Sequence, residues 1–193
     1  MKISKKNNQG QSMMEMIFSI GILVTAISAI IALNASNINS QKQSEYLIVA
    51  NNLAREGIEV VRSFRDRNWL AGQNWDKNLE LAGSYLPCFN ENLNSWAIVP
   101  FDSESIDQLF ISNIGVYSCD TTGLPTVYYR HLRLSHICLD ISETPAKGTE
   151  TIKDLCDSSA EKKIGLSVQS VIKWSEHNRP HQVIIEDLLY DWK

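Results

Sequence analysis

Residues 7–33, NNQGQSMMEMIFSIGILVTAISAIIAL, decide the fold of this 193-residue chain. The 18 residues from Met16 to Leu33 carry no charge. Because an α-helix rises about 1.5 Å per residue, a helix of that length nearly spans the ~30 Å hydrocarbon layer of a bilayer. The sequence therefore predicts a helix that enters a membrane. One acid, Glu15, stands directly before this uncharged stretch.

Two ordinary explanations leave part of this segment unexplained. The apolar core of a secretory signal peptide is usually only about 7–15 residues long and is followed by a small-x-small cleavage site. Here the site ending at Ala35 would have Leu33, which is not small, two residues upstream. A plain membrane anchor accounts for the lysines in the first six residues as a positive-inside flank. It does not account for Glu15, because a membrane carboxylate costs about 2–3 kcal/mol and normally has a partner.

A third explanation uses all of these features together. A basic leader, then Gly10, then an acid at the fifth position after it and an apolar helix resemble the class III signal of type IV prepilins and pseudopilins. The resemblance implies that a prepilin peptidase cleaves between Gly10 and Gln11 on the cytoplasmic side. It further implies that the retained helix both anchors and polymerises the subunit. Glu15 would then pair with the freed α-amine of a neighbouring subunit.

The segment departs from the family pattern at four positions. Such proteins usually have Phe at the first mature position, where this chain has Gln11. Ser12 replaces the common Thr, and Met13 and Met14 replace the usual Leu and Ile. Gly10 and the acid are retained, so the departures concern N-methylation of Gln11 more than cleavage.

Residues 34–70 predict an amphipathic helix that continues the apolar one. Its apolar face recurs at steps of three or four residues. That face comprises Leu47, Ala50, Ala54, Ile58 and Val61, and it ends at Phe64 or Arg65.

The opposite face of this helix carries charges. Arg55 with Glu59 and Arg62 with Asp66 stand at i,i+4 spacing, where exposed ion pairs add tenths of a kcal/mol. The Asn- and Ser-rich residues 34–40 are poor helix formers, and Gly57 is a further weak point. We expect the helix to be weakened at both places.

Two further stretches resemble PilV-type minor pilins. Residues 50–70, ANNLAREGIEVVRSFRDRNWL, match the region that follows the apolar helix in that family. The W-S-E-x-x-R-x-x-x-V pattern that begins at Trp174 matches its last hairpin. Trp69 is expected to cover the helix end, and Arg62, Arg65 and Asp66 are interpreted as the helix terminus and its packing rather than as a binding site.

Residues 71–193 predict a β-rich head. Apolar and polar residues alternate from Ile164 to Trp174, which indicates a strand with one buried and one wet face. After the turn EHNRP, residues 181–192 return as a second strand. Another strand is expected at Val127–Leu139 after the TTGLP turn, with shorter ones at residues 96–99 and near Tyr117.

The chain has four cysteines: Cys88, Cys119, Cys138 and Cys156. Their spacing is not that of a zinc site, and an even number in a membrane-targeted chain indicates two disulfides outside the cytoplasm. Three pairings are possible. We favour Cys138 with Cys156, which would close the polar loop at residues 144–151 and leave Cys88 for Cys119. Buried free thiols are the alternative.

Nothing in the sequence indicates catalysis, a metal or a cofactor. His131 and His136 are five residues apart on a predicted strand and would face opposite sides, and His177 and His181 flank a turn. None of the common nucleophile, zinc-protease or phosphate-loop motifs occurs. With 22 acidic and 18 basic residues, the chain is not expected to use nucleic acid as its main ligand.

The expected fold class is therefore α+β and pilin-like, with a long N-terminal helix packed on an antiparallel sheet. The expected segments are a leader at residues 1–10, a transmembrane helix at 11–33, an amphipathic helix at 34–70 and a head at 71–193. By resemblance the chain is a minor pilin in the inner membrane with an extracytoplasmic head, which reaches the cell surface when the pilus assembles.

The implied partners are prepilin peptidase, other pilins, the assembly machinery and membrane lipid. Two alternatives stay open. One is an anchored extracytoplasmic binding domain that never polymerises, and the other is a pseudopilin of type II secretion or DNA uptake.

Overall fold

The computed structural model describes residues 9–102, 107–141, 148–176 and 178–191, with the side chains of residues 9–12 left out. Most of the expected leader, His177 and the last residue of the expected final strand lie outside these ranges. Within them the chain forms one helix and eight strands. It divides into two compact units, Met1–Tyr46 and Leu47–Lys193, which are described separately.

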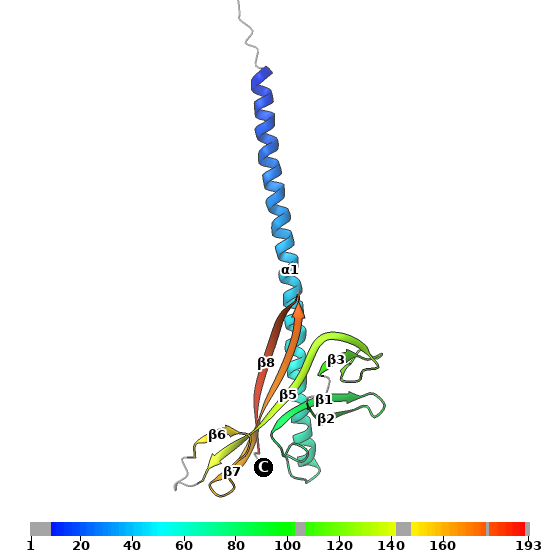
Figure 1. The fold of residues 1–193 in the computed structure, drawn as a ribbon, viewed down its shortest axis with the longest axis vertical. Coiled ribbons are helices and arrows are strands. Elements are labelled where there is room, and N and C mark those ends of the chain that lie inside the picture. Colours follow the sequence, from blue (N-terminus) through cyan, green and yellow to red (C-terminus); the bar gives the residue numbers. More distant parts are fainter. Residues whose placement is uncertain (1–8, 103–106, 142–147, 177, 192–193) are drawn as a thin grey trace, which may run out of the picture. The chain divides into compact units, whose positions relative to one another are not determined.

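Helix α1 runs without a break from Gln9 to Leu70, a length of 62 residues (Figure 1). Local melting of the helix at residues 34–40 is therefore wrong, whereas a bend there and a lower local stability at Gly57 stay predictions. Poor helix formers cost only tenths of a kcal/mol each, and a helix that is already nucleated on both sides propagates through them.

In the second unit, the part of α1 from Leu47 onward packs against the sheet. The predicted apolar row is buried at Ala50, Ala54, Ile58 and Val61, and both Phe64 and Arg65 are buried at its end. Leu47 was placed on this face wrongly, since it is 45% exposed. Leu53 and Val60 are also buried, so the covered face is wider than a single row.

All strand pairs in the eight-stranded sheet are antiparallel. The strands are β1 (Gly83–Asn90), β2 (Ser95–Pro100), β3 (Gln108–Ile111), β4 (Tyr117–Ser118), β5 (Leu124–Asp140), β6 (Glu150–Lys153), β7 (Glu161–Glu176) and β8 (Arg179–Tyr190).

Strand β5 is the centre of the sheet (Figure 1). Along one edge it pairs with β7, which in turn pairs with β8. Along its other edge it pairs in succession with β3, β1 and β6. Strands β2 and β4 extend the sheet from β1 and β3.

The core lies between the sheet and the second part of α1. Leu132 and Leu134 of β5, Leu166 and Val168 of β7 and Leu189 of β8 pack with helix residues in one buried cluster. Gly57 lies at the closest approach, because a Cβ built on it would stand 2.7 Å from Ser170 Oγ and 3.0 Å from Leu132 Cδ2. This glycine therefore allows α1 and the sheet to touch.

The structure corrects the expected wet face of β7. Leu166, Val168, Ile172 and Trp174 are buried as the alternation predicts, but Ser167 is buried too. The Ser167 hydroxyl donates a 2.6 Å hydrogen bond to Glu186 Oε1 of β8, so a neighbouring side chain covers it. Alternation identified the strand correctly and overstated the difference between its two faces.

The α+β fold class is confirmed. The C-terminal hairpin is present, with Asn178 at its turn in the left-handed region, at a φ of 62°. Strands also occur where they were expected at residues 96–99, at Tyr117 and at Val127–Leu139. Strands β1, β3 and β6 were not predicted.

Candidate functional site

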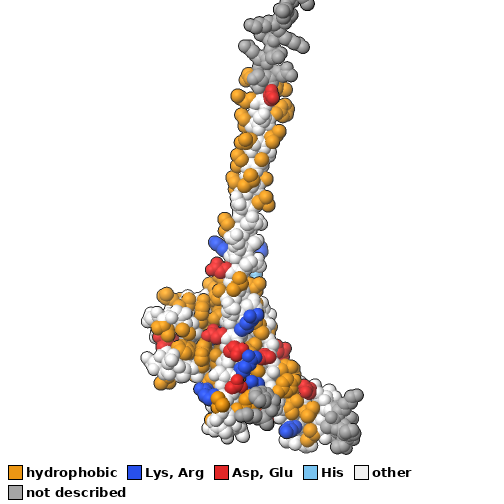
Figure 2. Space-filling view, turned by 180° about the vertical axis from the view of Figure 1, so that it is seen from behind, with side chains coloured by type: hydrophobic (Ala, Val, Ile, Leu, Met, Phe, Trp, Pro, Cys, Tyr) orange, Lys and Arg blue, Asp and Glu red, His pale blue; other side chains and the backbone are white. Residues whose placement is uncertain are grey.

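The first candidate site is the apolar part of α1. Its large apolar side chains between Met13 and Leu33 are all exposed, and no residue in its most apolar window is buried within the described unit. Figure 2 shows apolar side chains around this part of the helix. By its length and composition, the helix is long and apolar enough to cross a membrane once.

The hydroxyl groups inside this stretch are already satisfied by the helix itself. Ser19 Oγ donates a 2.8 Å hydrogen bond to the Glu15 carbonyl, and Ser28 Oγ donates one of the same length to the Val24 carbonyl. Thr25 Oγ1 donates to the Ile22 carbonyl at 2.8 Å. Because such bonds spare the hydroxyls a desolvation penalty, the stretch can enter an apolar environment in spite of its Ser and Thr residues.

The predicted processing and assembly residues lie at the start of α1. The backbone of Gly10 and Gln11 is helical. Glu15 is exposed, and among the described residues its carboxylate forms no hydrogen bond or ion pair. Within the described part of the chain, Glu15 is therefore an acid without a partner at the edge of an apolar helix.

Within the second unit, the sheet is held to α1 by a buried cation that was not predicted from the sequence. Arg130 of β5 has a fully buried side chain and donates from Nη1 to Glu56 Oε2 at 2.9 Å. Its Nη2 donates to the Pro87 carbonyl at 3.1 Å. Burial lowers the pKa of Arg130, and the charge of Glu56 opposes that shift. The only sequence signal was a basic residue on the inward-facing register of a predicted strand.

The charged face of α1 pairs differently from the prediction. Arg62 bonds to Glu59 at 2.6 Å and to Asp187 of β8 at 2.5 Å, rather than to Asp66. Asp66 pairs instead with Arg65 at 3.0 Å. The i,i+4 pairing was wrong because β8 brings a carboxylate to this face, which the helix sequence cannot reveal.

The end of α1 is packed as expected. The guanidinium of Arg65 lies 4.6 Å from the centre of the Trp69 ring, and Arg65 is itself buried. Asn68 Nδ2 donates to the carbonyls of Trp75 and Lys77, which holds the following loop against the helix. These contacts give the residues at the helix terminus a structural role.

Both disulfides join the pairs that the sequence favoured. Cys88 on β1 bonds to Cys119, which follows β4, and Cys138 on β5 bonds to Cys156, which follows β6. The Cα–Cα separations are 5.2 Å and 5.5 Å, which are usual for disulfides. None of the four cysteines is free.

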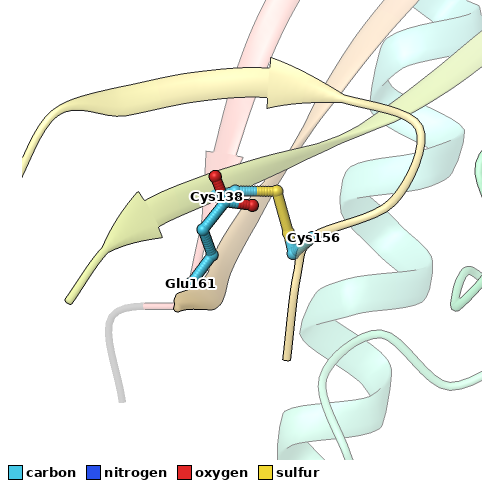
Figure 3. Close-up of side chains that lie close together, drawn as sticks. All are labelled: Cys138, Cys156 and Glu161. Carbon is cyan, nitrogen blue, oxygen red and sulfur yellow. A yellow bond between two sulfur atoms is a disulfide. The ribbon is translucent and has the colours of Figure 1, made fainter. Parts of the chain in front are cut away.

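One trio of side chains has the composition of a metal site. Cys138, Cys156 and Glu161 bring their ligand atoms within 4.8 Å of one another (Figure 3). Both sulfurs are consumed by the disulfide, however, and a metal binds the thiolate form. The Glu161 carboxylate is held by Lys153 and by the Asp157 amide at 2.9 Å, and the Lys153 contact lowers the pKa of Glu161. The trio is therefore a disulfide beside a carboxylate that already has its own partners.

The described histidines have separate neighbours. His131 stacks on Phe101 at 5.6 Å, with Nδ1 3.6 Å from Asp107 Oδ2. His136 lies on the other register of β5, and its Nε2 is 2.8 Å from the Glu80 carbonyl. His181 stacks on Trp174 at 5.3 Å. These packing contacts give each ring a structural explanation.

Comparison with known proteins adds no relative. No protein-family model, curated protein or solved structure matches this chain. Its function is therefore inferred from the apolar helix, the unpaired acid and the disulfide-bonded head.

Proposed function

We propose that this chain is a minor type IV pilin-like subunit. It enters the membrane as a prepilin, is cleaved after Gly10 and is incorporated into a pilus filament or primes one. The observation that carries the proposal is the apolar helix from Met13 to Leu33, wholly exposed within its unit and led by the unpaired carboxylate of Glu15.

The energetics of this helix require a partner along its whole length. In the membrane, lipid covers the apolar side chains. When the subunit leaves the membrane, only other apolar surfaces can replace lipid, and helices of neighbouring subunits supply them. Glu15 would set the axial register by pairing with the α-amine that cleavage frees on the neighbouring subunit.

The charges and cysteines of the chain support an orientation with the N-terminus in the cytoplasm and the head outside the inner membrane. The lysines at the extreme N-terminus favour a cytoplasmic start, which leaves the head outside the inner membrane. Two disulfides in the head fit an oxidising compartment. The proposed partners are prepilin peptidase, other pilins, the pilus assembly machinery and lipid.

The test is the N-terminus of the protein recovered from membranes of cells with and without a prepilin peptidase. Intact mass and terminal sequencing should give a start at Gln11 that depends on the peptidase. A Gly10→Val variant serves as the uncleaved control, because the larger side chain blocks the peptidase without changing the apolar helix.

A start at Met1 in both strains would contradict the proposal and favour an extracytoplasmic domain on a plain anchor. If cleavage occurs, co-purification separates a pilus subunit from a pseudopilin of type II secretion or DNA uptake, because each class assembles with a different set of pilins.

A further inference from the structure

A groove of ≈ 600 Å³ opens in the head where β3, β5, β7 and β8 come together. Its walls come from the residue before β3, from β5, and from the end of the β7–β8 hairpin. The volume lies within the usual range for small-molecule sites, about 300–1,000 Å³. The disulfides and the apolar helix do not line it, and of the contacts described above those of Asp107 with His131 and of His181 with Trp174 involve its residues.

The floor of the groove is a row of side chains across three strands. Tyr129 of β5 is in register with Lys173 of β7, and Lys173 with Gln182 of β8. Partners in antiparallel register project from the same face of a sheet. Tyr129 is 39% exposed, so one aromatic ring on this floor is open to a ligand.

Trp174 and His181 at the hairpin end also border the groove, but as the next register pair their rings project from the opposite face of the sheet. The rings of Trp174 and His181 are stacked at 5.3 Å with an angle of 15° between them. Trp174 is 5% exposed, and its indole Nε1 has no hydrogen-bond partner among the described residues. The ligand contacts of the groove therefore come from the side of the sheet with the floor formed by Tyr129, Lys173 and Gln182, and the indole N–H of Trp174 is not among them.

The polar groups around these rings define the chemistry of the ligand. Asp107 offers only acceptors, Lys173 offers only donors, and Gln182 offers both. The charges of Asp107 and Lys173 cancel, so the groove has no net attraction for an ion of either sign. It suits a neutral molecule with many hydroxyl groups and an apolar face.

We propose that this groove binds a neutral saccharide. The C–H face of a pyranose ring stacks on Tyr129, and its hydroxyl groups bond to Asp107, Lys173 and Gln182. A peptide that adds a strand would pair along the open edge of β8, which among the described strands pairs only with β7, whereas the floor of the groove lies on the face of the sheet. The inference concerns the head alone and does not depend on filament assembly.

The test uses the full chain purified in a polyoxyethylene detergent, which has no sugar headgroup to compete. Methyl glycosides of neutral hexoses and N-acetylhexosamines are screened by saturation-transfer NMR. At least one should bind, and Tyr129→Ala and Gln182→Ala should each weaken that binding by about tenfold or more. Tyr129→Phe should retain most of the binding because it keeps the ring.

Gln169→Ala is the matched control, since Gln169 lies on the same face of β7 outside the groove and should leave binding unchanged. Absence of a signal from every glycoside overturns the proposal, and so does binding that the groove variants and the control lower equally. Binding of a proline-rich peptide in place of the glycosides also overturns it. None of these outcomes bears on cleavage after Gly10, so the two proposals fail independently.

Discussion

At the scale of single residues, the most specific prediction concerns the replacement of Glu15. In the proposed filament its carboxylate neutralises an amine among apolar helices, where an unpaired charge costs about 3–5 kcal/mol. Glu15→Ala should therefore leave cleavage after Gly10 intact and lower the amount of the subunit in sheared filaments by about tenfold or more. The measurement is an immunoblot of the sheared and membrane fractions.

Glu45→Ala is the control for this variant. Glu45 is another exposed acid of α1, beyond the uncharged stretch, and its loss should leave incorporation near the level of the unaltered chain. Normal incorporation of Glu15→Ala would remove the proposed role of the acid in assembly.

Arg130 illustrates what single residues do not reveal in advance. A cation at an inward position of a predicted strand normally argues against that strand assignment. It is tolerated because Glu56 of α1 and two backbone carbonyls, Leu53 and Pro87, surround its guanidinium. These partners lie 43 to 77 positions away in the chain, so only the folded structure brings them together.

At the scale of elements, the contact between α1 and the sheet depends on Gly57. In an exposed helix, replacing Gly by Ala stabilises by up to about 1 kcal/mol. At position 57 the added Cβ would meet Ser170 Oγ at 2.7 Å, so the helix and sheet must separate or Ser170 must shift. We expect Gly57→Ala to destabilise the head by about 1–3 kcal/mol, measured by chemical unfolding in detergent.

Gly21→Ala is the matched control in the same helix, because a Cβ there would meet nothing within 4 Å. Adding Ser170→Ala to Gly57→Ala should recover part of the lost stability. Ser170 Oγ is buried without a hydrogen-bond partner in the described structure, so its removal leaves no other group unpaired. Equal effects of the two glycine substitutions would show that the close approach at Gly57 has no energetic consequence.

The elements that could be predicted are those whose sequence pattern is local, that is, contained within the element itself. The apolar row of α1 and the alternation in β7 are local, and both identified their elements. Strands β3 and β6 have four residues each and pair with β5, whereas β1 has eight residues and pairs mainly with β2, so each is defined by partners outside its own segment. The groove proposed to bind a saccharide was also missed, because Asp107, Tyr129, Lys173 and Gln182 come from four separate segments.

At the scale of the whole molecule, the histidines of β5 make stability depend on pH. Burial lowers the pKa of His131, with Lys173 adding to the effect and Asp107 opposing it. Burial also lowers the pKa of His136, where Lys163 adds to the effect and the Glu80 carbonyl opposes it. The folded head therefore favours the neutral form of both rings.

The sign of the effect follows from proton binding. In the unfolded chain both histidines titrate near their usual pKa of about 6.5, so as the pH falls below that value the unfolded state takes up protons before the folded one. The free energy of unfolding should be fully retained above about pH 7 and decrease as the pH falls from 6.5 toward 5. Denaturant titrations across this range measure it.

His136→Gln tests the source of this dependence. Gln retains a side-chain N–H for the Glu80 carbonyl but does not titrate, so the variant should lose less stability between pH 7 and pH 5 than the unaltered chain. An unchanged pH profile in this variant would assign the dependence to other groups.

The position of β5 at the centre of the sheet also fixes the order in which the head can be completed. One full edge of β5 is covered by β7, and β7 and β8 are the last strands to be synthesised. Until they arrive, β5 has an open edge, and Leu132 and Leu134 lack the β7 part of their core. Bare edges and apolar faces of this kind pair with other chains. The head is therefore most prone to aggregation before β7 and β8 have been synthesised and paired.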